Sequence, residues 1–138
     1  MNATNLTSFI APPNLTSLSH PGNLDPAFLG AFRGCSSLSN VVLNEGLEMI
    51  TNQCFSGCTS LTTIDIPSTV TKLASNTSFT EGSYSVFYGC SALQTVTGGE
   101  GIIVLGPSAF NGCSNLRSIS DIDFSQITHI GELCFKEC

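Results

Sequence analysis

An ungapped internal repeat is the feature that most constrains how this chain folds. When the sequence is shifted by 55 residues, residues 6–60 align with residues 61–115, and 16 of the 55 positions are identical. Nearly all the identical positions hold an apolar residue, Gly or Cys, and residues 116–138 begin a third unit. Self-similarity at a fixed period is typical of chains that stack similar units around one core, so it predicts a repeat architecture.

A shorter period lies within each 55-residue unit. The motif Phe-x-Gly-Cys recurs with its aromatic residue at Phe32, Phe55, Phe87 and Phe110, and in a degraded form at Phe135. The separations are 23, 32, 23 and 25 residues, so a short repeat alternates with a longer one. The extra residues fall between Leu18 and Phe32 and again between Leu73 and Phe87.

Each short repeat contains the signals of one coil of chain. The alternation in Ile64-Asp65-Ile66 sends every second side chain to the same face, which predicts a short strand. A turn with Pro or Gly follows, and a second apolar pair, such as Val70 and Leu73, returns to the core. The segment Cys54-Phe55, closed by Gly and Cys, suits a single helical or 3₁₀ turn on the opposite side. One such coil cannot bury its own apolar residues, so the coils are expected to stack.

The block Phe-x-Gly-Cys-Ser-Ser-Leu-x-x-Val-x-Leu resembles the BspA-like leucine-rich repeats, and the resemblance covers residues 6–138. It implies an α/β repeat fold: a right-handed leucine-rich-repeat solenoid of about five rungs, with a parallel β-sheet on one face and short helical or 3₁₀ turns opposite. Residues 1–138 are expected to form one domain with units 6–60, 61–115 and 116–138, as part of a longer array. The buried Asn ladder of leucine-rich repeats is expected to have no counterpart, because Gly46, Thr69 and Gly101 stand near its place.

The charge of the chain excludes several classes of partner. Only 10% of the residues are charged and the net charge is −6, so the cationic surface that binds phosphate backbones or anionic lipid is absent. We therefore expect no nucleic acid and no membrane insertion. The Ser, His and Asp residues have no fixed spacing that would indicate a catalytic triad, and Gly106-Pro107-Ser108 is not a nucleophile elbow. No enzymatic activity, catalytic residue or cofactor is predicted.

The seven cysteines leave three interpretations open. Four of them share one column of the repeat, and two more occupy a column that elsewhere holds Ala or Val, which favours buried free thiols. A metal site is one alternative, formed by Cys54-x-x-x-Cys58 and Cys134-x-x-x-Cys138 with His20 or His129, although the two pairs are expected to lie several coils apart. Disulfides between neighbouring coils are the other alternative.

A calcium loop is a further alternative, because Asp121-x-Asp123-x-Ser125 is followed by Glu132 at the spacing of an EF-hand. Gln126 argues against this interpretation, because the sharp turn of such a loop requires Gly at that position. No metal site is therefore predicted.

The candidate partner-binding residues lie at two kinds of position. The outward strand positions are expected to form rows across the sheet, and one row contains Val42, Asp65, Thr97 and Ser120. The nine-residue expansions carry apolar or aromatic residues in segments that otherwise resemble loops, namely Phe28, Leu29, Phe79 and Tyr84. Such residues on a rigid scaffold are typical of binding sites, and the alternative is that they fold back to cover the core.

These observations together predict a non-enzymatic protein-interaction or adhesion module of a cell-surface or secreted leucine-rich-repeat protein. Its partner would be a protein, such as a host matrix component or receptor, or a glycan. The alternative is a structural rod segment, or a subunit that forms a homo-oligomer through the open ends of the solenoid. A small-molecule binder that uses the apolar expansions is a third alternative.

Overall fold

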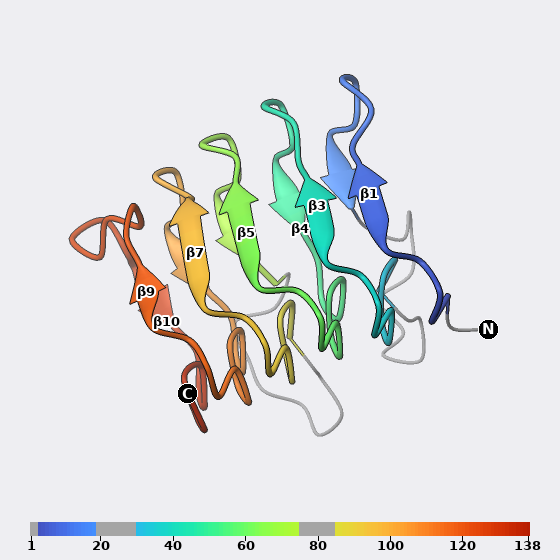
Figure 1. Cartoon of the computed structure of the whole chain (residues 1–138). Coiled ribbons are helices and arrows are strands. Elements are labelled where there is room, and N and C mark those ends of the chain that lie inside the picture. Colours follow the sequence, from blue (N-terminus) through green and yellow to red (C-terminus); the bar gives the residue numbers. More distant parts are fainter. Residues whose placement is uncertain (1–2, 19–29, 75–84) are drawn as a thin grey trace.

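The computed structural model describes residues 3–18, 30–74 and 85–138. These residues form ten short strands: β1 (Ser8–Ile10), β2 (Ser17–Leu18), β3 (Asn40–Val42), β4 (Met49–Ile50), β5 (Thr63–Ile66), β6 (Lys72–Leu73), β7 (Thr95–Gly98), β8 (Val104–Leu105), β9 (Ser118–Ile119) and β10 (His129–Ile130). All the strand pairs are parallel. The odd-numbered strands lie side by side on one face, and the even-numbered strands lie behind them (Figure 1).

The odd-numbered strands confirm the alternation expected from the sequence. In β5, Ile64 and Ile66 are buried while Thr63 and Asp65 are exposed. These strands form two separate sheets, a pair β1-β3 and a triplet β5-β7-β9. Strands β3 and β5 are neighbours in space, yet no strand pairing joins them. This face of the described chain is therefore interrupted between its second and third strands.

The even-numbered strands form a second sheet that the sequence analysis did not predict. It has five strands in the order β10-β8-β6-β4-β2. Each of these strands contains only two residues, and in β4 and β6 the second residue, Ile50 or Leu73, is fully buried. The expected sheet on one face is thus corrected to sheets on two faces, because the second apolar pair of each repeat is itself extended and hydrogen-bonded to the neighbouring coils.

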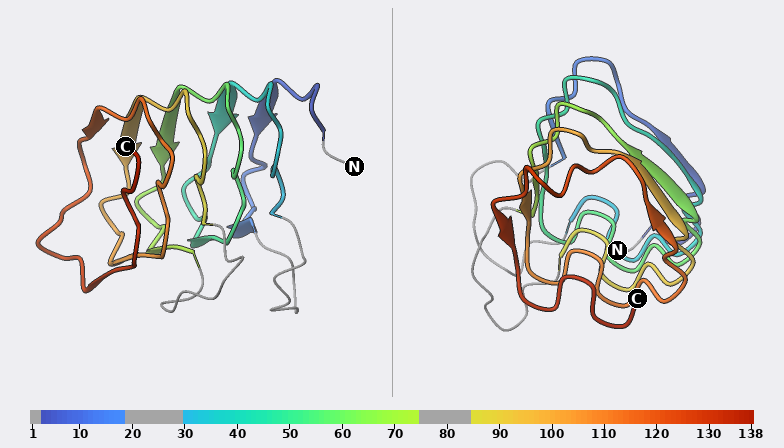
Figure 2. Two further views of the ribbon diagram at one scale, coloured as in Figure 1. Left: turned by 90° about the horizontal axis from the view of Figure 1, so that it is seen from below. Right: turned by 90° about the vertical axis from the view of Figure 1, so that its left-hand side faces the viewer.

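Two kinds of turn connect the strands. We call the segments that lead from an odd-numbered strand to the next even-numbered strand the outer turns: residues 11–16, 43–48, 67–71, 99–103 and 120–128. We call the segments that carry the repeated motif the Phe-Gly-Cys turns: residues 30–39, 51–62, 85–94, 106–117 and 131–138. Seen along the stack, these two sets lie at opposite ends of the cross-section (Figure 2, right).

The Phe-Gly-Cys turns correct the expectation of helical or 3₁₀ turns. In each of them isolated turns replace a helix; for example, the Cys58 N–H donates to the Phe55 carbonyl at 3.1 Å. Gly57 has a φ of 74°, a left-handed conformation that favours glycine and interrupts a helical path. As a result the Gly57 N–H points to the next coil and donates to the Tyr88 carbonyl at 2.8 Å. The local sequence therefore builds a ladder between coils instead of a helix.

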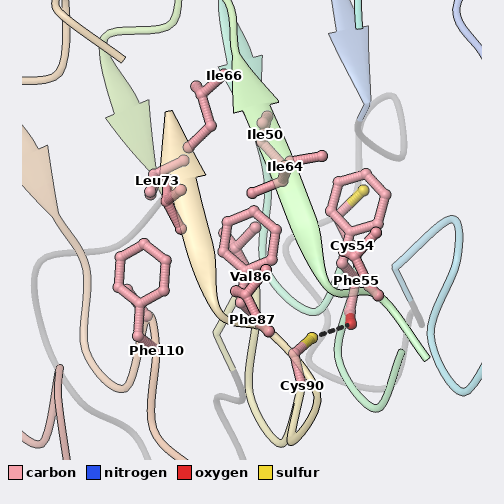
Figure 3. Packing of buried hydrophobic residues seen from close by; sticks show 14 of the residues in the cluster. Ile50, Cys54, Phe55, Ile64, Ile66, Leu73, Val86, Phe87, Cys90 and Phe110 are labelled. Carbon is pink, nitrogen blue, oxygen red and sulfur yellow. Dashed lines mark hydrogen bonds between the residues drawn. The ribbon is translucent and has the colours of Figure 1, made fainter. Parts of the chain in front are cut away.

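A column of phenylalanine rings runs through the core. The rings of Phe32, Phe55, Phe87, Phe110 and Phe135 are stacked, with centroids 5.3 to 5.6 Å apart and interplanar angles of 3 to 10°. Figure 3 shows Phe55, Phe87 and Phe110 in line, beside the aliphatic residues of both kinds of strand. Parallel aromatic pairs add about 0.5–1.5 kcal/mol each beyond the burial of their surface. The alignment of these rings confirms the repeat register derived from the sequence.

Candidate functional site

The outer face of the odd-numbered strands keeps the predicted row in register within each of its two sheets. Val42 of β3 pairs with Ile10 of β1, and Thr97 of β7 pairs with Asp65 of β5. Val42 is 48% exposed and Ile10 is 68% exposed. These two exposed aliphatic side chains form an apolar patch at the β1-β3 end of this face.

The remainder of the face is polar. The Thr97 hydroxyl donates to the Asp65 carboxylate at 2.8 Å. Ser120 follows β9 and is exposed, and its N–H donates to the Val96 carbonyl at 3.2 Å. Three of the four predicted face residues therefore lie together beyond the interruption, and Val42 lies on its other side. Phe28, Leu29, Phe79 and Tyr84 lie outside the described residues.

The sheet of even-numbered strands presents a second row that sequence reasoning missed. Its first positions are in register across all five strands and comprise Ser17, Met49, Lys72, Val104 and His129. Lys72 is exposed, whereas Met49 and His129 are partly buried. The Nε2 atom of His129 is buried and has no hydrogen-bond partner among the residues that the structure describes. The signal that could have revealed this row is the recurrence of an inward aliphatic residue directly after each of its positions.

The outer turns are joined by side-chain hydrogen bonds that differ from one coil to the next. Asn44 donates from Nδ2 to the carbonyls of Pro13 and Leu15, both at 3.2 Å. Thr69 donates to the Leu47 carbonyl at 2.7 Å and accepts from the Gly46 N–H at 3.0 Å. Different side chains therefore connect successive coils near the positions considered for an Asn ladder.

Several carboxylates of the outer turns bind neutral donors. Glu45 accepts from the Ser68 N–H at 3.2 Å and from its hydroxyl at 3.0 Å. Asp121 accepts from the Gly98 N–H at 2.9 Å. These hydrogen bonds position the carboxylates while leaving their negative charge uncompensated.

The alternative of a calcium loop depends on Asp121 and Asp123, and the two carboxylates bind different partners. Asp123 accepts from the hydroxyl and the N–H of Ser125, at 2.7 and 2.9 Å, and these hydrogen bonds lower the pKa of its carboxyl group. Asp121 turns instead to Gly98 of the preceding coil. Among residues 3–18, 30–74 and 85–138, no three His, Cys, Asp or Glu side chains gather as a metal ion would require.

The cysteines are all free thiols, and those within the stack are buried. Cys58, Cys90 and Cys113 each donate a weak hydrogen bond to a Phe carbonyl of the preceding coil, at 3.1 to 3.2 Å. Figure 3 shows one of these contacts, from Cys90 to the carbonyl of Phe55. Burial raises the pKa of Cys58 and Cys113 to about 12. These thiols therefore stay protonated at neutral pH, whereas a nucleophile or a metal ligand would have to be a thiolate.

A family model for the BspA-type leucine-rich repeat region matches residues 1–83 and 29–138 and finds six copies of the repeat. The chain belongs to the BspA-type leucine-rich repeat family. Its parallel sheets and stacked turns are a repeat, solenoid-like form of that family's architecture. Comparisons with the curated proteins and with the solved structures found no match. The described residues contain no apolar helix of the length that a membrane crossing needs. Leucine-rich repeats of this type are generally interaction modules without enzymatic activity.

Proposed function

We propose that this BspA-type leucine-rich repeat chain is a non-enzymatic adhesion or protein-interaction module of a cell-surface or secreted protein. Its binding surface is the outer face of the odd-numbered strands, centred on Val42, Asp65, Thr97 and Ser120. The partner is a protein or a glycan. The segments that carry Phe28, Leu29, Phe79 and Tyr84 contribute to binding it. The proposal includes one domain with a right-handed coil of about five rungs, the hand that parallel crossovers favour.

One observation supports this proposal most directly. Ile10 and Val42 are paired across β1 and β3 and are 68% and 48% exposed, whereas the inward residue Val41 is buried. Exposed aliphatic residues in a contiguous group are characteristic of interaction surfaces, since a partner that covers them removes their apolar area from water.

A pull-down from host matrix extracts tests the proposed face with Val42→Ser as the decisive variant. The control is Ile103→Ser, because Ile103 is an exposed aliphatic residue of similar size that lies beside the even-numbered strands. We expect Val42→Ser to lose the captured partner and Ile103→Ser to retain it. Equal capture by both variants would contradict the proposed face. A second variant, Phe79→Ser with Tyr84→Ser, tests the loop contribution and is expected to reduce capture with little change in melting temperature.

Self-association is a second candidate function. It is favoured by the exposure, near β10, of two side chains whose equivalents in the preceding coil are buried. Ile130 is 49% exposed and Phe135 is 36% exposed, although Leu105 and Phe110, which precede them in the same columns, are fully buried. A second copy that stacks here would bury both side chains. Sedimentation velocity tests this candidate: Ile130→Asp should convert any oligomer to monomer, and a chain that is monomeric at high concentration would exclude it.

A further inference from the structure

The carboxylates of the chain are concentrated along one edge. The outer turns carry Glu45, Glu48, Glu100, Asp121 and Asp123, all exposed, and no Lys or Arg. Arg33, Arg117 and Lys136 lie instead in the Phe-Gly-Cys turns, at the opposite end of the cross-section (Figure 2). The net charge of −6 is therefore unevenly distributed, and the outer turns form its strongest negative region within the described chain.

This negative charge is not neutralised within the described residues. The one ion pair they contain joins Lys136 and Glu137 at 3.6 Å, and both belong to a Phe-Gly-Cys turn. On the outer turns the donors to Glu45 and Asp121 are neutral hydroxyl or N–H groups. Such donors orient a carboxylate without cancelling its charge. The carboxylates of this edge can therefore still pair with positively charged groups of a partner.

The charged edge borders the apolar part of the proposed binding face. Val42 is the last residue of β3, and the outer turn that begins after it contains Glu45 and Glu48. On the next coil the outward residue nearer to this edge is Asp65, which adds a further carboxylate. A partner that covers Val42 and Ile10 therefore meets negative charge on one side.

The spacing of the carboxylates indicates the shape of the matching partner. Glu45 and Glu100 occupy equivalent outer turns, after β3 and after β7, with β5 between those strands. The stacked rings of these three coils are 5.3 and 5.6 Å apart, which puts the two turns about 11 Å from each other along the stack. A polyproline II segment rises about 3.1 Å per residue and repeats every three residues, so every third side chain recurs on one side at about 9 Å.

We propose that the odd-strand face binds a cationic, proline-rich protein segment, which lies across the strands with its basic side chains on the outer turns. This proposal rests on the proposed function and names the class of its partner. Proline rings cover Ile10 and Val42, while Lys or Arg residues at every third position pair with the carboxylates near Glu45 and Glu100. Charge complementarity selects this occupant over an acidic or neutral segment.

Fluorescence anisotropy with a labelled peptide of three Lys-Pro-Pro repeats tests the proposal. The test variant is Glu45→Gln with Glu100→Gln, and the matched control is Glu132→Gln with Glu137→Gln, which removes two carboxylates from a Phe-Gly-Cys turn. Both change the net charge equally. We expect the test variant to weaken binding about five- to thirtyfold at low salt and the control to change it less than about twofold. Equal weakening by both would show that only net charge matters and would overturn the proposal.

Three further results distinguish the remaining outcomes. A peptide with the same composition but its three Lys residues adjacent should bind less tightly, and equal binding would overturn the proposed spacing. Dimerisation of the chain at low salt that the Glu45→Gln, Glu100→Gln variant abolishes would make a second copy the occupant and would also overturn the proposal. If the Lys-Pro-Pro peptide does not bind, while Val42→Ser still loses its partner in the pull-down, the cationic partner is wrong and the proposed function stands.

Discussion

The two sets of turns differ in how they connect one coil to the next. The Phe-Gly-Cys turns repeat nearly the same residues on every coil, and they connect the coils through the same contacts each time: a stacked ring, a thiol donor and a glycine N–H. The outer turns use different residues on each coil and different side-chain hydrogen bonds, such as those of Asn44 and Thr69. Repetition is required where side chains pack inside the stack, whereas the solvent-facing turns are free to vary.

Alkaline pH should break the comparison most severely, because it acts on the buried thiols of the Phe-Gly-Cys turns. Burial raises the pKa of Cys58, Cys113 and Cys134 from 9.0 to about 12. Below about pH 8 the folded and unfolded chains both keep these protons, so the stability is complete. Between about pH 9 and 12 only the unfolded chain loses them, and each thiol lowers the free energy of unfolding by about 1.4 kcal/mol per pH unit.

We therefore expect cooperative unfolding in this pH range, measured by circular dichroism. The Cys58→Ala, Cys113→Ala variant should lose stability less steeply as the pH rises. A free energy of unfolding that is constant up to pH 11 would contradict the assignment of these thiols as buried and protonated.

Phe87→Ala should have the largest effect of any single substitution. The Phe87 ring is fully buried between those of Phe55 and Phe110, so its removal leaves a cavity in the column. We expect a loss of about 3–5 kcal/mol in urea denaturation. The control is Phe124→Ala in an outer turn, where the ring is 49% exposed and less than about 1 kcal/mol should be lost. Equal losses would show that the two sets of turns do not differ in this way.

Two cysteines of the same column, one buried and one exposed, provide a comparison with a smaller expected effect on stability. Cys90→Ala removes a fully buried thiol and its hydrogen bond to the Phe55 carbonyl, which we expect to cost about 1–2 kcal/mol. Cys138 makes the same kind of contact with the Phe110 carbonyl, at 3.2 Å, but it is exposed. Cys138→Ala should therefore cost less than about 0.5 kcal/mol in the same assay. A cost as large as that of Cys90→Ala would mean that burial is not the deciding factor.

The smallest expected effect is on an outer turn. Thr69→Val removes the hydroxyl that connects Gly46 and Leu47 to the next coil, and the loss should be about 1 kcal/mol or less. Hydrogen exchange should show faster exchange of the Gly46 N–H, which loses its acceptor, while the Gly57 N–H remains protected. Unchanged exchange at Gly46 would contradict a role for Thr69 in connecting the coils.

Much of the fold could be predicted from the sequence because the repeated residues are also the buried ones. The spacing of Phe32, Phe55, Phe87 and Phe110 gave their alignment directly, since rings in one column must recur once per coil. The inward position of Ile64 and Ile66 followed from simple alternation. Membership of the family was likewise visible in the Phe-x-Gly-Cys block.

The remaining features depend on backbone geometry that residue type does not determine. A two-residue strand such as Lys72-Leu73 has too few positions to show a period, so the second sheet was missed. The expected helical turns were wrong because the left-handed Gly57 redirects its N–H to the neighbouring coil. The geometry of the proposed face could be predicted in part: the Asp65-Thr97 pair follows from the register, whereas the hydrogen bond from the Gly98 N–H to Asp121 crosses between coils and leaves no local pattern.

The missing backbone pairing between β3 and β5 has a mechanical consequence. Every other neighbouring pair of odd-numbered strands in the described chain is linked by a ladder of hydrogen bonds, but this joint depends on core packing, on the turns and on the even-numbered sheet. A tensile load applied along the long axis of the stack would concentrate there. Under such a pull the molecule would part first between the coils of Val42 and Asp65, within the face proposed to hold its partner.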